Sequence, residues 1–273
     1  DKLKESLQKA FAMKTALITG ASSGIGTAFA QELASRNYNL VLVARSQDKL
    51  EELAKQLQET HAINIEIIVQ DLTTNNAAQT VFDTVIEKGI HIDLLVNNAG
   101  FGDYGLFAES SLEKQLEMIQ LNITALVGLT HLFLSPMREQ RNGGIINVSS
   151  IAGFQPLPYM SVYAATKSFV LSFSEALWVE NQDAGVTVTC VCPGATETQF
   201  FIRAEFPDSF TQSNPQGYAS PEEVVKATLQ AFEAKQANAV TGGLANQIIS
   251  NIPRFLPREA LVKAVAKQFA PKK

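Results

Sequence analysis

The segment TALITGASSGIG, residues 15–26, decides the fold class of this 273-residue chain. The apolar run at 15–19 leads directly into a turn that carries Gly20, Gly24 and Gly26. Such a turn between a strand and a helix can hold the phosphates of a dinucleotide, because glycine lets the backbone approach them and the helix N-terminus supplies N–H donors. The spacing G-x-x-x-G-x-G differs from the general G-x-G-x-x-G pattern, so the turn by itself leaves phosphate binding and a tight structural turn both open.

Strand-like and helical patterns alternate along the rest of the chain. The strand-like runs are 15–19, 39–44, 64–70, 93–99, 144–150 and 186–192. The helical patterns are 25–36, 46–60, 73–88, 112–136, 161–182 and 220–235. Buried strands alternating with helices predict an α/β fold, a single Rossmann-type doubly wound parallel sheet of about seven strands with helices on both faces.

The chain divides into three parts in this interpretation. Residues 13–249 form the nucleotide-binding domain, which includes a substrate loop at 195–219. Residues 1–12 are an extension of uncertain origin, and 250–273 form a basic amphipathic tail. The tail holds six Lys or Arg and one Glu, a net charge of +5, whereas the whole chain carries −5.

Composition limits the partners and the compartment. A net charge of −5 disfavours nucleic acid as a partner, so we expect a small-molecule ligand. Cys190 and Cys192 lie two apart in a strand-like run and are expected to pack in the core of a reducing compartment. We find no uninterrupted apolar run of membrane-spanning length and no signal peptide. We therefore expect a soluble, cytoplasmic protein, and we predict no metal site.

The end of the second predicted strand indicates which dinucleotide is bound. An acidic residue there accepts the free 2'-hydroxyl of NAD, whereas an arginine accommodates the 2'-phosphate of NADP. This strand ends VLVARS, with Arg45 as the cation and Ser22, Ser23 and Ser46 as further donors. We predict NADP over NAD by roughly 10- to 100-fold, since a hydrogen bond to a charged group contributes about 1.5 to 3 kcal/mol. The alternative is that Arg45 is a solvated loop cation.

A second pattern suggests acid–base chemistry. In SVYAATKSF, residues 161–169, Tyr163 and Lys167 lie four positions apart and so share one face of a helix. A nearby positive charge favours the phenolate, which would bring the tyrosine pKa closer to working pH. This spacing also arises by chance, so it is ambiguous by itself.

Several motifs in register resemble the short-chain dehydrogenase/reductase family over roughly residues 14–245. They are TGASSGIG at 19–26, DL at 71–72, NNAG at 97–100, LN at 121–122, NVSS at 147–150, YAATK at 163–167, and PG at 193–194 with Thr198. NNAGFGDYG and YAATKSFVLSFSEAL look like the branch near 17-beta-hydroxysteroid dehydrogenases and 3-ketoacyl reductases. The resemblance implies carbonyl reduction or its reverse.

The resemblance also implies roles for four catalytic residues. Tyr163 would exchange a proton with the substrate oxygen, which Ser150 would also hydrogen-bond. Ser149 is the competing candidate, because a one-residue change reverses the face of a strand. Lys167 would hold the nicotinamide ribose and, with the positive nicotinamide, depress the pKa of Tyr163. Asn122 would hold a water chain leading to Lys167; its alternative is a satisfied core polar residue.

Further positions would bind the cofactor. Asn97, Ala99 and Gly100 would let the edge of the sheet approach it. Asp71 would contact the adenine, or would instead serve a helix N-terminus. The full predicted cofactor set is Gly20, Ser22, Ser23, Gly24, Ile25, Gly26, Arg45, Asp71, Leu72, Asn98, Ala99, Gly100, Tyr163, Lys167, Pro193, Gly194, Thr196 and Thr198.

Four questions stay open from the sequence: the substrate, the role of the tail, the assembly and an alternative function. Apolar loops at 101–107, 153–160 and 195–210 favour a hydrophobic ketone or aldehyde. The tail, with Leu261, Val265 and Phe269 at four-residue spacing, could bind an anionic membrane surface, cover the active site, mediate assembly, or pack on the domain as a solvated helix. The resemblance further implies a homodimer or homotetramer formed through 112–136 and 161–182.

An NADP-binding regulator without turnover is the alternative function, and an epimerase is disfavoured because the chain is short.

Overall fold

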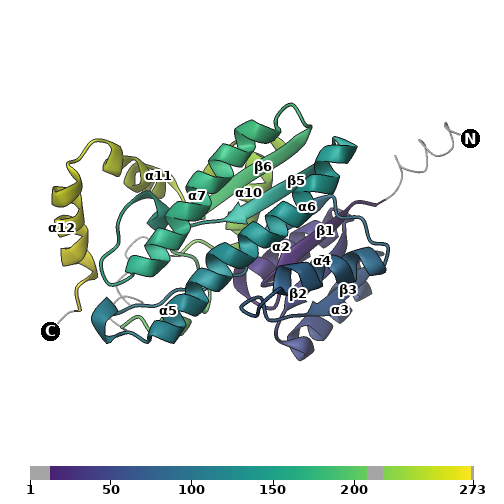
Figure 1. Ribbon diagram of the computed structural model, residues 1–273, viewed down its shortest axis with the longest axis horizontal. Coiled ribbons are helices and arrows are strands. Elements are labelled where there is room, and N and C mark those ends of the chain that lie inside the picture. The colour runs from purple at the N-terminus through teal and green to yellow at the C-terminus, as the bar shows by residue number, and fades with distance from the viewer. Residues whose placement is uncertain (1–12, 208–217, 272–273) are drawn as a thin grey trace, which may run out of the picture.

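Seven parallel strands form one sheet in the order β3-β2-β1-β4-β5-β6-β7 within the part of the chain that the structure describes (Figure 1). This computed structural model describes residues 13–207 and 218–271. The predicted extension 1–12 and the middle of the predicted substrate loop lie outside the described residues. The strands are β1 Thr15–Thr19, β2 Asn39–Ala44, β3 Ile65–Val69, β4 Leu94–Asn97, β5 Gly143–Val148, β6 Val186–Pro193 and β7 Asn238–Thr241.

The predicted fold class is confirmed, and six strands occur where alternation placed them. The seventh strand, β7, was not located from the sequence, because its four residues, NAVT, are too few to show a strand pattern. It pairs in parallel with β6, from Cys190 opposite Asn238 to Pro193 opposite Thr241.

Helices cover both faces of the sheet, and each face has its own hydrophobic core. The main helices are α2 Gly24–Ser35, α3 Gln47–Thr60, α4 Ala77–Glu87, α5 Leu112–Ile119, α6 Leu126–Gln140, α7 Ser161–Asn181, α8 Phe200–Arg203, α10 Pro221–Glu233, α11 Leu244–Asn251 and α12 Arg258–Phe269. On one face, Phe29 of α2, Leu50 of α3 and Val224 of α10 are fully buried. On the other, Val81 of α4 and Phe133 of α6 are buried. Burial on both faces explains the continuous apolar strands.

The order of the strands reverses at β1, which has β2 on one side and β4 on the other. In an open parallel sheet, ligands bind beyond the carboxyl ends of the strands at this switch point. The glycine turn follows β1 directly, so the topology places it at this crevice.

The helix predicted over 112–136 is not continuous. A π-helical turn, Gln120–Ala125, separates α5 from α6 and contains Asn122. Such turns are rare and frequently occur at functional sites. The combined helix Leu112–Gln140 is long enough, and has a high enough mean hydropathy, to cross a membrane. The search of the sequence for uninterrupted apolar runs did not find it. Here Leu129, Phe133 and Met137 of its α6 half are buried against the sheet.

Candidate active site

The carboxyl ends of the central strands open onto a cavity of about 860 Å³. Its lining includes Gly20 after β1, Asn98 after β4, Ser150 after β5 and Gly194 after β6. All of the predicted site residues except Gly26, Asn97 and Asn122 line this cavity, although they come from positions 20 to 198 of the chain. The structure therefore brings the predicted site together in one place.

The glycine turn requires its glycines for different reasons. Gly20 and Gly24 have φ of +65° and +55°, a region that side chains other than glycine rarely adopt. At Gly26 a Cβ atom would lie 2.2 Å from the Gly20 carbonyl oxygen and 2.6 Å from the Asn98 side-chain nitrogen. The missing side chain thus lets α2 begin directly against the end of β1.

The first turn of α2 fits a phosphate. Ser23 occupies the N-cap position, yet its side chain makes no capping hydrogen bond, and Ser23, Gly24 and Ile25 all line the cavity. The first N–H groups of a helix have no partner within the helix and carry partial positive charge. An anionic diphosphate would satisfy them.

Arg45 and Asp71 lie at the next two strand ends. The Arg45 side chain is 71% exposed, and its Nη1 atom is 3.7 Å from Oδ2 of Asp71. Oδ1 of Asp71 accepts hydrogen bonds from the backbone N–H and the hydroxyl of Thr73, at 2.9 and 2.7 Å. Although burial raises the pKa of Asp71, these hydrogen bonds and the Arg45 charge hold it below its ordinary value. Asp71 closes this turn rather than capping α4, whose N-cap is Asn76.

Asn97 differs from its expected placement. Its Nδ2 atom donates to Thr130 Oγ1 at 3.0 Å and to Asn147 Oδ1 at 2.9 Å, and the side chain is buried away from the cavity. Asn98 instead reaches the glycine turn, donating to the carbonyl oxygens of Thr19 and Gly20 at 3.0 and 3.3 Å. Asn97 therefore joins neighbouring elements beneath the site, and Asn98 holds the turn.

Asn122 connects the loop after β4 to α7. Its Nδ2 atom donates to the Phe101 carbonyl at 3.0 Å and to Thr166 Oγ1 at 3.1 Å, while its Oδ1 atom accepts from the Phe101 N–H at 3.1 Å. A Cβ atom on Gly100 would lie 2.9 Å from Asn122 Oδ1 and 3.4 Å from Lys167 Nζ. Asn122 thus lies next to Lys167 and positions the loop; its role in a water chain stays a prediction.

Tyr163, Lys167 and both serines converge at the end of β5. Lys167 Nζ donates to the Val148 carbonyl at 2.9 Å and lies 5.7 Å from the centre of the Tyr163 ring. Ser149 Oγ donates to the Lys167 carbonyl at 2.7 Å, so this hydroxyl already serves the backbone of α7. Ser150 accepts from the Ala152 N–H at 3.1 Å, and its interaction with the Tyr163 hydroxyl lowers the pKa of that group. Of the two candidates, Ser150 is the serine that reaches Tyr163.

The pKa of Tyr163 is shifted against the predicted direction. Burial raises it to about 12, and the Ser150 hydrogen bond lowers it only in part. Burial also lowers the pKa of Lys167 to about 8, although neighbouring Cys190 and Cys192 oppose this. The reason is that Lys167 directs its ammonium at a backbone carbonyl, so desolvation outweighs any attraction between the pair. The predicted effect of a positive nicotinamide on Tyr163 stays a prediction.

Residues 14–206 match the family described as short chain dehydrogenase. The chain is a short-chain dehydrogenase. The predicted family is confirmed, and its fold binds a nicotinamide cofactor.

Two curated relatives place this short-chain dehydrogenase in the predicted branch. The 17-beta-hydroxysteroid dehydrogenase type 3 of Mus musculus is 33% identical over 261 residues, which cover 93% of this chain and 80% of that protein. The very-long-chain 3-oxoacyl-CoA reductase of Homo sapiens is 31% identical over 249 residues, which cover 88% of this chain and 76% of that protein.

Solved structures agree over nearly the whole dehydrogenase. A short-chain dehydrogenase from Sphingobium yanoikuyae in complex with NADPH is 32% identical with a TM-score of 0.79, covering 96% of each chain. The bulky-bulky ketone specific alcohol dehydrogenase from Comamonas testosteroni is 31% identical with a TM-score of 0.75, covering 96% of this chain and 95% of that one.

Aromatic and aliphatic side chains surround Tyr163 in this dehydrogenase. The Phe200 ring, from α8, lies with its centre 5.2 Å from that of Tyr163. Leu157 and Met160 are buried beside it. The same cavity is lined by Phe101, Leu157, Met160, Phe200, Phe201 and Phe206. We call this apolar end of the cavity the substrate chamber, because it is the place that we propose below for the substrate.

A charged cluster that no sequence motif indicated lies beside the chamber. Lys114, which lines the cavity, contacts Asp103 at 2.5 Å and Glu205 at 2.7 Å. Gln115 donates to the other oxygen of Asp103 at 2.6 Å. The cluster links α5 to the loop after β4 and to the segment after α8. No local pattern could reveal it, because Lys114 and Glu205 are 91 residues apart.

The tail closes the chamber. Leu261 and Val265 of α12 are buried in the cluster that contains Tyr163, and Phe269 lines the cavity. Tyr104 donates its hydroxyl hydrogen to the Phe269 carbonyl at 2.6 Å. Of the alternatives for the tail, two are therefore both correct: α12 packs on the domain, and it covers the site. Its Leu261–Val265 face is used inside the protein and is not free for a membrane.

Proposed function

We propose that this short-chain dehydrogenase uses NADP(H) to interconvert a bulky hydrophobic ketone or aldehyde and its alcohol, with Tyr163 as the acid or base. The observation that carries the proposal is the meeting of Tyr163, Ser150 and Lys167 in the same cavity as the glycine turn. Catalysis requires the proton donor, the oxygen-binding group and the cofactor site to lie together. This arrangement disfavours the alternative of a regulator without turnover.

NADPH is proposed on two grounds. Arg45 is exposed at the end of β2, and the neighbouring lining of the cavity includes Ser22, Ser23 and Ser46, which can donate to a 2'-phosphate. The dehydrogenase from Sphingobium yanoikuyae was solved in complex with NADPH. When bound, the nicotinamide supplies or accepts the hydride at the carbonyl carbon.

The residues of the chain then handle the oxygen and its proton. The Ser150 hydroxyl donates a hydrogen bond to the substrate oxygen and positions it beside the Tyr163 hydroxyl. In the reducing direction Tyr163, which burial keeps protonated, gives its proton to that oxygen. Lys167 lies close to the Tyr163 ring. It can return a proton to the Tyr163 phenolate, because burial brings the pKa of the lysine to about 8.

The apolar chamber supports the substrate class. Around Tyr163 its lining includes several aromatic and aliphatic side chains, and such walls favour a large apolar ligand. Relatives are named for hydroxysteroids, very-long-chain 3-oxoacyl-CoA and bulky ketones, all of them large substrates.

The test is a panel of ketones and aldehydes of increasing size, with loss of NADPH absorbance as the readout. We expect turnover of bulky apolar ketones. Tyr163→Phe should bind NADPH with unchanged affinity, measured by fluorescence, and lose essentially all turnover. A wild-type rate in this variant would contradict the catalytic assignment. Binding of NADPH without turnover of any substrate would favour the regulator.

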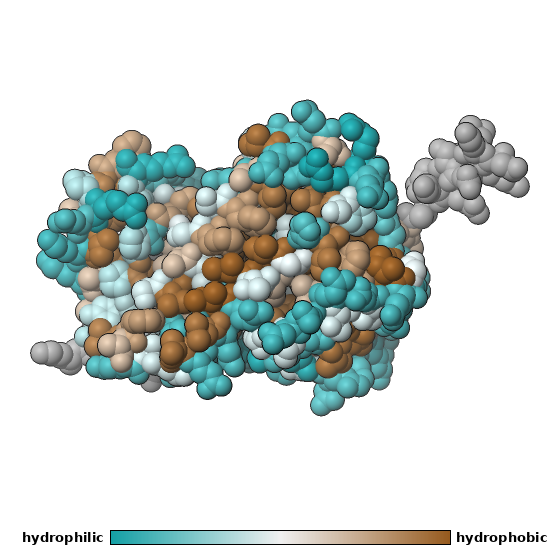
Figure 2. Space-filling view, in the orientation of Figure 1, coloured by the Kyte–Doolittle hydropathy of each residue, from teal (hydrophilic) through white to brown (hydrophobic). Residues whose placement is uncertain are grey.

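Assembly and location are also proposed. Apolar side chains gather over α5, α6 and α7 on one face of the molecule (Figure 2). Leu112, Leu116 and Ile119 of α5 and Phe169 and Val179 of α7 are exposed there. Burial of this face against a second copy would form the predicted homodimer or homotetramer. A cytoplasmic location stays a prediction.

A further inference from the structure

A row of apolar side chains projects outward from α11 and from the 3-10 turn Ile252–Arg254 that follows it. Leu244, Ile248, Ile252 and Phe255 are 76%, 63%, 38% and 82% exposed. They are spaced by four, four and three residues, which places them on one side of the helix and its continuation. We call these four residues the outer stripe. Leu256 extends it and is also exposed.

The opposite side of α11 is the polar one. Asn246 donates to the carbonyl oxygens of Thr241 and Gly242 at 2.9 and 3.0 Å, and Ser250 is buried. A helix on a globular protein normally places its apolar side inward. Here polar contacts already fasten α11 to the end of β7, so the outer stripe is not needed to hold the helix and faces solvent.

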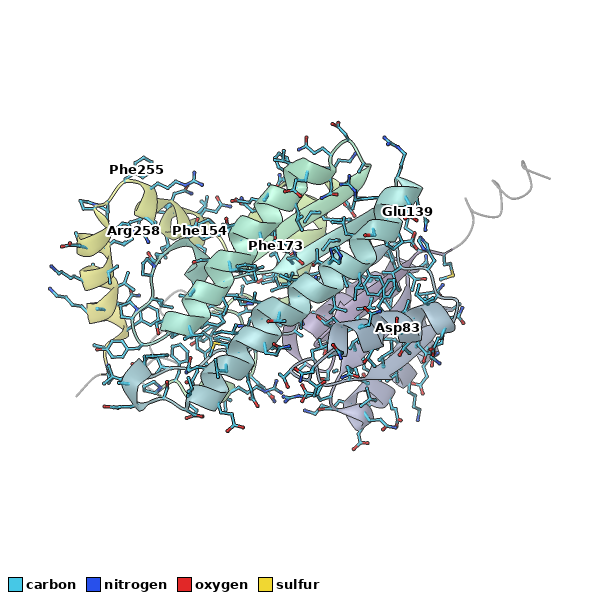
Figure 3. All side chains as sticks on the ribbon, in the orientation of Figure 1. Asp83, Glu139, Phe154, Phe173, Phe255 and Arg258 are labelled. Carbon is cyan, nitrogen blue, oxygen red and sulfur yellow. The ribbon has the colours of Figure 1, made fainter. Side chains whose placement is uncertain are left out.

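The charge around the outer stripe differs in sign from the rest of the chain. Arg254 and Arg258 flank Phe255, and both are exposed. Figure 3 shows Phe255 and Arg258 at the outer corner where α11 leads into α12, at the end of the molecule away from β1, β2 and β3. From residue 250 onward the chain carries +5, against −5 for the whole. Exposed apolar groups bordered by arginines match an anionic lipid surface, which offers hydrocarbon below a layer of negative charge.

The stripe also lies beside the substrate chamber. Ile249 lines the cavity, and the adjacent residue Ile248 belongs to the outer stripe. A surface docked on the stripe would therefore lie one helix away from the chamber. An apolar substrate dissolved in a bilayer would then be close to its site.

We propose that the outer stripe, with Arg254 and Arg258, is a docking surface for an anionic membrane. This surface replaces the α12 face that the sequence suggested. The proposal is independent of the proposed function, because its test measures binding and not turnover.

The test is sedimentation of the full chain with vesicles of phosphatidylcholine, either pure or containing phosphatidylserine. We expect binding to the anionic vesicles that weakens as salt is added. Arg254→Gln with Arg258→Gln should lower the partition coefficient about 30-fold, which corresponds to about 1 kcal/mol for each arginine. Ile248→Ser with Phe255→Ser should lower it at least tenfold at every salt concentration.

Matched controls distinguish binding through the outer stripe from nonspecific adsorption to the vesicles. Ile86→Ser on α4 removes an exposed apolar side chain elsewhere, and Lys49→Gln on α3 removes an exposed cation. Both should bind like the wild type, and all variants should keep the wild-type circular dichroism spectrum and melting temperature.

Two results would overturn the proposal. One is an intact chain that stays in the supernatant with phosphatidylserine vesicles, or stripe variants that sediment as the wild type does. The other is a fall in molar mass, by light scattering, in Ile248→Ser with Phe255→Ser, because the stripe would then be covered by a second copy of the chain.

Discussion

Replacing Lys167 by methionine should change how the stability of the protein depends on pH. Burial lowers the pKa of this lysine from 10.5 to about 8 in the folded protein. Between these two values the unfolded chain binds more protons than the folded one, so the lysine makes stability rise with pH across this window. Below it, the full penalty of about 3 kcal/mol for burying the charge is present, and above it the penalty is gone.

The expected size of the effect follows from these values. From about pH 7 to about pH 9.5, the free energy of unfolding of the wild type should rise by about 2 kcal/mol relative to Lys167→Met. Tyr163 does not disturb the comparison. Its raised pKa lowers the stability of the folded state only as pH rises above its unfolded value of 10, and both proteins retain it.

The assay is urea unfolding at a series of pH values and one protein concentration. The single tryptophan, Trp178, reports unfolding by fluorescence because its indole N–H is held by the Lys235 carbonyl. Lys49→Met, which removes an exposed lysine, should differ from the wild type by the same amount at every pH. A difference between wild type and Lys167→Met that also stays constant with pH would refute the reasoning, since the buried ammonium would then cost nothing.

Four further changes test the site. Arg45→Asp should erase the predicted 10- to 100-fold preference for NADPH, measured as the ratio of kcat/KM for NADPH and NADH; an unchanged ratio would leave Arg45 a solvated cation. Gly26→Ala should lower the free energy of unfolding by about 2 to 4 kcal/mol in urea, because its Cβ would meet the preceding turn at 2.2 Å, and wild-type stability would contradict the close approach. Ser150→Ala should lower kcat about 100-fold with little change in stability. Ser149→Ala should instead lower stability by about 1 to 3 kcal/mol and keep kcat within a few-fold, and the reverse outcome would exchange the two assignments.

Much of the site was predictable because the family motifs follow the strands. Each parallel strand ends at the same edge of the sheet, so a motif directly after a strand is brought to that edge by topology alone. Gly20, Asn98, Ser150 and Gly194 were placed in this way. Their placement at this edge follows from the strand order alone and requires no knowledge of side-chain packing.

Placement at the level of single side chains was less predictable. Asn97 and Asn98 are adjacent, yet one joins a buried polar network and the other holds the glycine turn. Ser149 and Ser150 divide in the same way between the backbone of α7 and the hydroxyl of Tyr163. Successive residues at the end of a strand face opposite ways, and composition cannot show which of them faces the ligand.

The sequence by itself determined the parallel sheet through its periodicity, and its resemblance to the family indicated the glycine turn and the pairing of Tyr163 with Lys167. These features lie within one element or between neighbouring ones. Only the tertiary structure decided that α12 turns its apolar face into the substrate chamber, that Lys114 bridges two distant loops, and that the outer stripe is left exposed. Those outcomes depend on contacts between residues far apart in the chain, where burial is settled by which surfaces meet and not by local pattern.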